Sequence, residues 1–305
     1  MSSLAELCSV YPYAGGQQAF TKALAPQRVR RLLSYLIGWV VLLGEIATSA
    51  GCSMNSALVV GGLIQLTHPD FQLQPWAVWL LYAGFLIVSV AFCLSQRHLP
   101  LVSAVGAMIT LGGGLAWGIS FLVMAPKVSA HFAFTEFINN SGYTHVGWVG
   151  IMSFYAPSYA LYGTDGILHI VEEIKDAESN APRAMIWSMI FSGITSLLSA
   201  LLIAFAPGNW PEYLDADFLI IVGINNAASR LAWGLARDNA LPFSTALFRI
   251  NSSFRTPINA ISFIVAAEMA IGLVVFGSDH AFEAIVSLGG VAIQIGYLIP
   301  VIMLL

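Results

Sequence analysis

The sequence contains little charge for its length: only 9% of its 305 residues are Asp, Glu, Lys or Arg. Soluble domains carry about 25% of these residues, whereas 58% of this chain is hydrophobic. These proportions exclude an ordinary soluble globular protein. They predict an integral membrane protein whose environment is a lipid bilayer.

Cysteine is also scarce, with three residues at Cys8, Cys52 and Cys93, which is too few for a disulfide framework. Nothing in the chain resembles a nucleophile triad, a phosphate-binding loop or a basic patch for nucleic acid. We therefore expect no enzyme, no catalytic residue, no cofactor and no nucleic-acid partner. The stretch Met1–Glu6 lacks the basic segment that opens a secretory signal peptide, so none is expected.

Long hydrophobic runs are abundant, and about 20 apolar residues suffice to cross a bilayer. They predict a single transmembrane domain over residues 1–305, with a half-helix stub, Ser2–Tyr11, followed by about eight full spans. The expected spans are Leu32–Leu66, Trp76–Ser95, Leu101–Ala125, the run from Val146, Ala184–Ala206, Phe218–Ala236, Pro257–Gly277 and Phe282–Leu305. The first would be about 50 Å long as a continuous helix. It must tilt, kink or protrude, and Gly51 and Gly61-Gly62 are the expected bends.

The positions of the basic residues test this arrangement. When the spans are threaded alternately, only Lys127 of the 12 Lys and Arg residues falls on one side, and all others fall on the opposite side. By the positive-inside rule the basic side is cytoplasmic. The sequon Asn139-Asn-Ser141 then lies outside. The pattern predicts a multi-pass membrane protein, which we expect in the plasma membrane.

One stretch does not suit a regular membrane helix. Tyr162-Gly-Thr-Asp-Gly166 continues the run from Val146, yet it holds two glycines and an acid. A carboxylate at bilayer depth costs at least ~2.5–3.5 kcal/mol. We therefore predict a break here, with Asp165 as the N-cap of a second half-helix that begins near Gly166.

Broken helices at the bilayer midplane form the substrate sites of secondary transporters. We accordingly predict that Tyr162, Gly163, Thr164, Asp165 and Gly166 bind substrate, mainly through backbone groups. The positive end of the half-helix would face a substrate carboxylate. Whether Asp165 only caps the helix or also contacts the ligand stays open.

Two further carboxylates, Glu45 and Glu268, lie within expected spans. An intramembrane acid is a functional hypothesis by default, so either residue could carry a coupling proton. The alternative is a neutral, hydrogen-bonded acid. We assign Glu45 to the substrate site together with Asn225, which either lines the cavity or bridges two helices.

His169, Glu172 and Glu173 follow Asp165 by four, seven and eight residues, which predicts one shared helical face. A histidine with two carboxylates suggests a metal site, and an intramembrane metalloenzyme built on these three residues is one alternative function. Lys175 and Arg183 are nearby in the sequence. We therefore expect ion pairs or gating contacts at these residues and no metal.

Several longer stretches resemble the amino acid–polyamine–organocation superfamily. Among its members the chain is most similar to fungal amino acid/choline permeases, which include the GABA and choline transporters. The stretches are Ser3-Leu-Ala-Glu6, Tyr11-Pro-Tyr-Ala-Gly-Gly-Gln17, Gly163-Thr-Asp-Gly-Ile-Leu-His169, Glu172-Glu173, Pro182-Arg-Ala-Met185, Ala228-Ser-Arg230, Trp233-Gly-Leu-Ala-Arg-Asp238, Leu241-Pro-Phe243, Ser287-Leu and Tyr297-Leu-Ile-Pro300. They follow the family order over nearly the whole chain.

The resemblance implies an all-α membrane protein of the LeuT type, in which two inverted repeats of five helices place broken first and sixth helices face to face. On that map the chain begins in the second helix and ends in the tenth, so the first helix and the last two are expected to be missing. The implied function is secondary active transport of a small amino acid or amine by alternating access. The alternative from another class is a truncated permease remnant that does not transport.

Overall fold

Every regular element is a helix in the residues that the computed structural model describes, which are 1–68, 73–94, 98–135, 143–154, 157–158, 161–205, 231–251 and 256–304. The prediction of an all-α membrane fold is confirmed. The helices are α1 Ser2–Val10, α2 Gln17–Leu24, α3 Arg30–Thr67, α4 Pro75–Leu94, α5 Leu99–Met124, α6 Ala130–Thr135, α7 Val146–Ser153, α9 Gly166–His169, α10 Ala177–Phe205, α12 Ser244–Leu247, α13 Ile258–Gly272 and α14 Asp279–Leu304, with short 3-10 turns at Val171–Glu173 and Leu273–Phe276.

Within these described ranges, six helices are long and apolar enough to cross a membrane: α3, α4, α5, α10, α13 with its 3-10 extension, and α14. They match six of the expected spans. A seventh, the run from Val146, forms the short α7 and is then interrupted. Of the expected span Phe218–Ala236 only residues 231–236 are described, and they are helical. The protein is therefore a multi-pass membrane protein.

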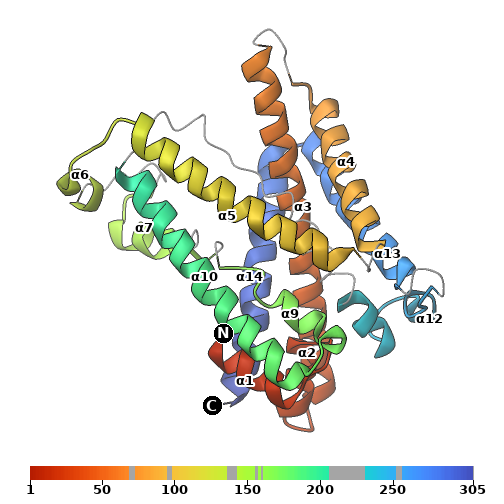
Figure 1. Cartoon of the computed structure of the whole chain (residues 1–305). Helices are drawn as coiled ribbons and strands as arrows, with labels where there is room; N and C mark the ends of the chain where they lie inside the picture. Colours follow the sequence, from red (N-terminus) through yellow and green to blue (C-terminus); the bar gives the residue numbers. More distant parts are fainter. Residues whose placement is uncertain are drawn as a thin grey trace.

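The central pair of the bundle is α3 and α14, which run side by side (Figure 1). Their backbones approach closely because glycines face each other. A Cβ added to Gly44 would lie 2.7 Å from Ile293 Cγ1 and 2.9 Å from the carbonyl oxygen of Gly289. A Cβ on Gly289 would in turn lie 2.5 Å from Ala47 Cβ. Small residues at such interfaces are the usual way in which membrane helices pack tightly.

Helix α3 continues without interruption through Gly51 and Gly61-Gly62, where bends were expected. A Cβ on Gly51 would lie 2.5 Å from Val286 Cγ1, and one on Gly61 would overlap the Leu73 side chain. Their role is close packing, because the missing side chains leave room for neighbouring residues.

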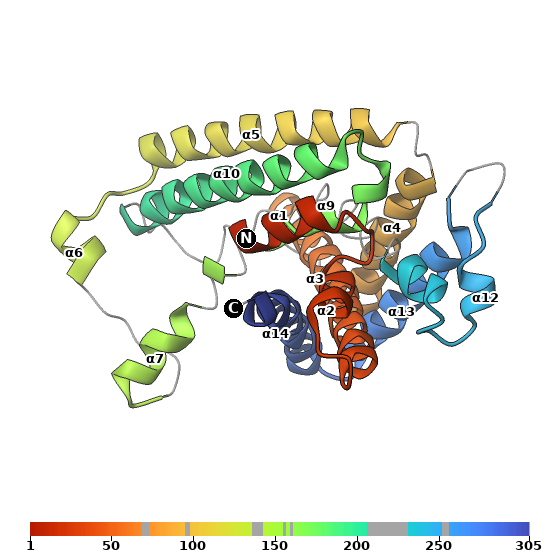
Figure 2. The ribbon, with the colours of Figure 1, turned by 90° about the horizontal axis from the view of Figure 1, so that it is seen from below.

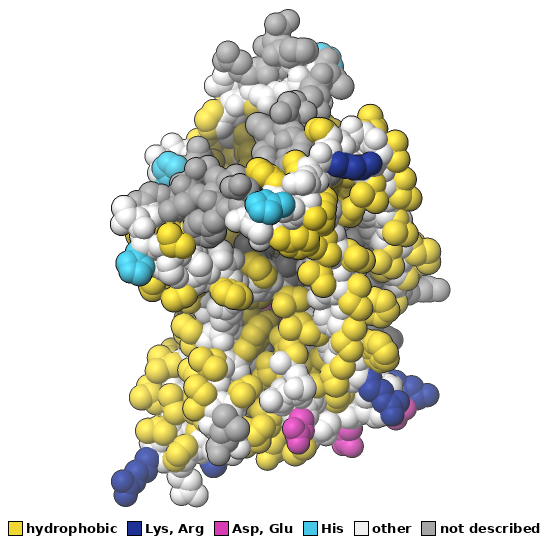
Figure 3. Space-filling model, turned by 90° about the vertical axis from the view of Figure 1, so that its left-hand side faces the viewer, with side chains coloured by type: hydrophobic (Ala, Val, Ile, Leu, Met, Phe, Trp, Pro, Cys, Tyr) yellow, Lys and Arg dark blue, Asp and Glu magenta, His cyan; other side chains and the backbone are white. Residues whose placement is uncertain are grey.

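The helices α1, α2, α9 and α12 lie toward the lower end of the molecule in Figure 1. On the face shown in Figure 3, hydrophobic side chains cover the middle, whereas the acidic and most of the basic side chains lie at that lower end. The distribution agrees with the cytoplasmic side that the positive-inside rule predicts.

The lower end also holds the packing that positions the broken helix. Buried side chains of α1, α9, the following 3-10 turn and α10 form one apolar cluster that includes Leu4, Leu168, Val171 and Met185. Viewed from below, α10 lies beside α5, while α7 stands apart from α3 and α14 (Figure 2). The second half of the broken helix is thus anchored in the bundle at its lower end.

Candidate functional site

The predicted interruption of the expected span that begins at Val146 is present. Residues 161–165 form a turn, and α9 begins at Gly166. Gly163 adopts φ +88°, a left-handed conformation that strains any residue with a side chain. The Gly166 N–H donates to the Gly163 carbonyl at 3.2 Å. Tyr162 ties the turn to α14, since its hydroxyl donates to the Gly290 carbonyl at 2.9 Å.

Asp165 occupies the predicted N-cap position of α9, but the prediction that its side chain forms a capping hydrogen bond is wrong. Its side chain makes no hydrogen bond to the helix. Instead Oδ2 accepts a 3.0 Å bond from Nε2 of Gln17, in the first turn of α2. The residue is 0% exposed, and its Oδ1 atom is buried without a hydrogen-bond partner. The carboxylate therefore connects the break to α2 and does not cap its own helix.

Helix α9 also has a smaller dipole than the sequence predicted. Helix α9 contains four residues and passes into the 3-10 turn Val171–Glu173. A macrodipole is the sum of aligned peptide units, and here few are aligned. Attraction of a substrate carboxylate to this half-helix is thus weaker than the sequence predicted.

His169 is held by the loop between α1 and α2. Its Nδ1 donates to the Ala14 carbonyl at 3.3 Å, which leaves Nε2 as the nitrogen with a lone pair. Nε2 is buried without a partner. Gly16, with φ +51°, lies against the ring, and a Cβ there would be 3.0 Å from His169 Cε1. Only a glycine allows this loop to approach the imidazole so closely.

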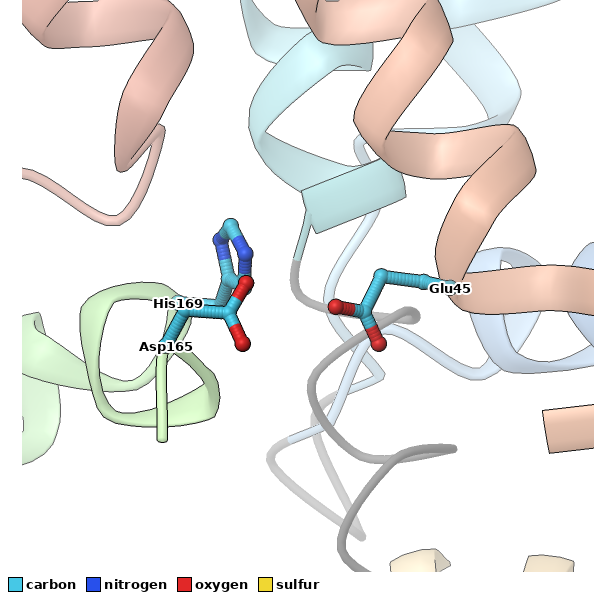
Figure 4. Close-up of side chains that lie close together, drawn as sticks. All are labelled: Glu45, Asp165 and His169. Atoms are coloured by element: carbon cyan, nitrogen blue, oxygen red, sulfur yellow. The ribbon is translucent and has the colours of Figure 1, made fainter. Parts of the chain in front are cut away.

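Glu45 reaches the same place from α3. Figure 4 shows its carboxylate directed toward the side chains of Asp165 and His169, which come from the broken helix. One ligand atom from each of the three residues lies within 4.8 Å of the other two, and all three residues are buried. The buried Tyr297 hydroxyl of α14 faces the two carboxylates. The structure thus brings together Glu45 and Asp165, two residues that the sequence assigned to one site.

The backbone of the break is accessible around Gly163. Among the described residues, nothing lies within 4 Å of the position that a Cβ on Gly163 would take. The neighbouring Thr164 is 6% exposed, and its hydroxyl is buried without a hydrogen-bond partner. Open space beside an unpaired hydroxyl suits a ligand that forms hydrogen bonds.

The prediction that Glu172 and Glu173 share a face with His169 is wrong. The chain leaves α9 at His169 and enters a 3-10 turn, whose tighter winding changes the direction of the following side chains. The two carboxylates are exposed, whereas His169 is buried. The residues gathered around His169 are Glu45 and Asp165, so the metalloenzyme alternative loses its proposed triad.

Glu172 instead links three segments at the lower end of the molecule. Its Oε1 accepts a 3.0 Å bond from the Ala14 N–H and forms a 3.2 Å ion pair with Arg237. The partner is therefore Arg237, where the sequence suggested Lys175 or Arg183. Arg237 also stacks on Trp233, 5.3 Å from its ring centroid.

The next residue in the sequence, Asp238, forms a second ion pair, with Lys22 at 3.5 Å. Gln18 also donates to Asp238, at 3.4 Å. Together these polar bridges join α2 and the α1–α2 loop to the segment 231–251. Of the other predicted site residues, Asn225 lies outside the described residues.

Sequence reasoning assigned no role to Gln17, Ala14, Arg237 or Tyr297. All four fall within the stretches that resemble permeases, and that is the signal that could have drawn attention to them. Ala14 acts through its backbone, which no side-chain pattern reveals.

The chain matches the family model described as amino acid permease over residues 1–209 and 218–305. It is 28% identical to a Macrophomina phaseolina protein that is named as an amino acid/polyamine transporter, over 98% of this chain and 73% of that protein. It is 25% identical to an amino-acid permease of Schizosaccharomyces pombe and 26% identical to the choline transporter of Saccharomyces cerevisiae. The matches cover 98% and 100% of this chain, and it spans 58% and 60% of the length of those two relatives.

Proposed function

The chain belongs to the amino acid permease family, and from this premise we propose that it carries a small amino acid or amine across the plasma membrane by alternating access. Its relatives include proteins named for amino acid/polyamine and choline transport. Secondary transporters of this kind bind substrate at broken helices near the bilayer midplane. The break at Tyr162–Gly166 is the part of the chain that fits this role.

The substrate lies against the open backbone at Gly163, where residues 161–165 form a turn and not a regular helix. Thr164 supplies the unpaired hydroxyl. The buried acidic side chains of Asp165 and Glu45 supply hydrogen-bond acceptors beside it, which favours a ligand with an ammonium group. Because α9 is short, recognition depends more on these groups than on a helix dipole.

The observation that carries the proposal is the left-handed Gly163 with open space beside it. Gly163→Leu places bulk where a ligand would approach and forces a strained φ. We expect it to abolish uptake of labelled choline, GABA or mixed amino acids in yeast lacking its own permeases, with normal membrane insertion. Gly193→Leu is the matched control, because that glycine lies in α10 with open space and ordinary helical φ. Normal uptake by the Gly163 variant would refute the proposed site.

The cytoplasmic gate consists of the bridge between Glu172 and Arg237, supported by Ala14, with His169 and Glu173 beside it. The bridge ties the end of the broken helix to the segment 231–251 and to the α1–α2 loop. Opening toward the cytoplasm requires these contacts to separate. The Lys22–Asp238 pair opens with them, because it joins the same two regions.

The coupling ion is a proton carried by Glu268 of α13. This residue is 0% exposed, and its carboxyl group interacts with Ser49 of α3. Tyr82 of α4 faces the carboxyl group and donates its hydroxyl to the Glu268 carbonyl at 2.6 Å. Glu268→Gln should abolish uptake driven by a proton gradient while substrate exchange continues. Gradient-driven uptake that matches the parent protein would exclude Glu268.

A further inference from the structure

Three of the polar atoms left without partners around Asp165 are acceptors, and the hydroxyls of Thr164 and Tyr297 are also unpartnered. His169 Nε2 has a free lone pair, because Nδ1 donates to Ala14. Gln17 uses its NH₂ group on Asp165, so its unpartnered Oε1 is an acceptor. Asp165 Oδ1 is a third unpartnered acceptor. Buried acceptors without donors are costly and call for a ligand that offers positive charge.

Glu45 adds a further carboxylate to this group. Its ligand atom and those of Asp165 and His169 lie within 4.8 Å of one another, and the three residues are 0–4% exposed. Two carboxylates so close together in a buried place repel each other unless one of them is protonated or a cation lies between them. The nearby basic side chains Arg237 and Lys22 are already paired with Glu172 and Asp238.

We propose that Glu45, Asp165 and His169 bind one divalent transition-metal ion of the zinc type. One imidazole nitrogen with two carboxylate oxygens is a donor set that zinc accepts in proteins. Calcium and magnesium prefer oxygen ligands alone, and copper(I) prefers sulfur. The proposal departs from the sequence expectation, which considered His169 with Glu172 and Glu173 and rejected a metal.

The surroundings of the three residues match those of metal ligands. A ligating histidine normally donates its other nitrogen to a carbonyl or carboxylate, which fixes its orientation; here Nδ1 donates to Ala14. Ligating carboxylates are likewise hydrogen-bonded, as Asp165 is to Gln17. In a tetrahedral zinc site the ligand atoms lie about 3.3 Å apart, and the three rotatable bonds of Glu45 allow that approach. Gln17 Oε1 is available for the fourth position.

A bound ion would join three segments that are distant in the sequence: α3 through Glu45, the broken helix through Asp165 and His169, and the α1–α2 loop through Ala14. It would compete with an ammonium substrate for the two carboxylates. Metal binding itself does not depend on transport, so it can be tested separately.

The test uses the full-length protein purified in detergent, stripped with chelator and titrated with Zn²⁺ by calorimetry. We expect one high-affinity Zn²⁺ per chain, and a loss of affinity of at least about tenfold in Glu45→Gln. The isosteric change keeps the packing of the helix. His280→Ala is the control for incidental binding, because His280 and Glu283 form an exposed pair at 3.8 Å. Unchanged affinity in Glu45→Gln, or loss of binding in His280→Ala, would overturn the proposal.

X-ray absorption of the zinc-loaded parent protein decides the matter even if a variant fails to fold. We expect a first shell of nitrogen and oxygen at about 2.0–2.2 Å. Sulfur at about 2.3 Å would instead indicate binding to the cysteines and would overturn the assignment.

Discussion

Gln17 and Asp165 are joined by a 3.0 Å hydrogen bond between buried side chains that are 148 residues apart in the sequence. The bond connects the first turn of α2 to the break that we propose as the transport site. It fixes the Asp165 carboxylate away from its own helix. The cytoplasmic half of the broken helix is thus positioned by the segment that precedes α3.

Gln17→Ala should lower the stability of the purified protein by about 1.5–3 kcal/mol, the usual effect of losing a hydrogen bond to a charged group. The measurement is thermal unfolding in detergent. Gln18→Ala is the matched control, because its bond to Asp238 is longer, at 3.4 Å, and only partly buried. Equal losses of stability in the two variants would show that the Gln17–Asp165 bond contributes no more to stability than the Gln18–Asp238 bond.

Gly16→Ala should destabilise the protein by about 1–3 kcal/mol, since a side chain is strained at a φ of +51°. The new Cβ would also press on the His169 ring. Gly15→Ala should be milder, because its Cβ meets Ala19 at 3.3 Å and its φ is not left-handed. If the ring contact matters, Gly16→Ala should cost less in a His169→Ala background. Strict additivity would assign the whole effect to the backbone.

Gly44→Ala should separate α3 from α14 and destabilise the bundle by about 1–3 kcal/mol, as overpacking does in tight interfaces. The nearby Ile293 side chain can move, but the Gly289 carbonyl at 2.9 Å belongs to the backbone of α14. Gly113→Ala in α5, where the described residues leave open space, should be neutral or stabilising by up to about 1 kcal/mol. Comparable thermal stability of the two variants would argue against the close approach of α3 and α14.

Glu172→Gln should weaken the proposed cytoplasmic gate while changing stability by less than about 1 kcal/mol, because both partners of the Arg237 pair are one-third exposed. The quantity to measure is the accessibility of the break to a reagent on the cytoplasmic side. A cysteine at Thr164, in a cysteine-free background, should react faster with a thiol reagent applied from the cytoplasmic side. Glu178→Gln, an exposed acid in the first turn of α10, should leave the rate unchanged. A slower or equal rate in Glu172→Gln would remove Glu172 from the gate.

Much of this architecture was predictable from the sequence. Long apolar runs give six of the expected spans, and the run of Gly163, Asp165 and Gly166 predicted the break, because glycine and acid are costly inside a membrane helix. Asp165 and Glu45 were assigned to one site for the same reason. These predictions depend on composition and local sequence, which can be read directly from the amino-acid sequence.

The contacts of the site were much less predictable. Asp165 was expected to cap α9, but a carboxylate can accept from any buried donor, and Gln17 is brought to it only by the tertiary packing of α1 and α2. Periodicity placed Glu172 beside His169 because it assumes a regular helix, whereas the chain changes to a 3-10 turn after His169. The partner of Glu172 is Arg237, 65 residues away, and sequence neighbours such as Lys175 could not reveal it.

Protection by substrate tests the central claim most directly. A single cysteine at Thr164 is introduced after replacement of Cys8, Cys52 and Cys93, and the protein is reconstituted in liposomes. The rate of thiol modification is then measured with and without saturating choline, GABA or mixed amino acids. If the break binds substrate, at least one of these should slow modification at Thr164 while a cysteine at Ser179, exposed in the first turn of α10, reacts at an unchanged rate. A transported substrate that leaves the rate at Thr164 unchanged would contradict the assignment of the Tyr162–Gly166 break as the transport site.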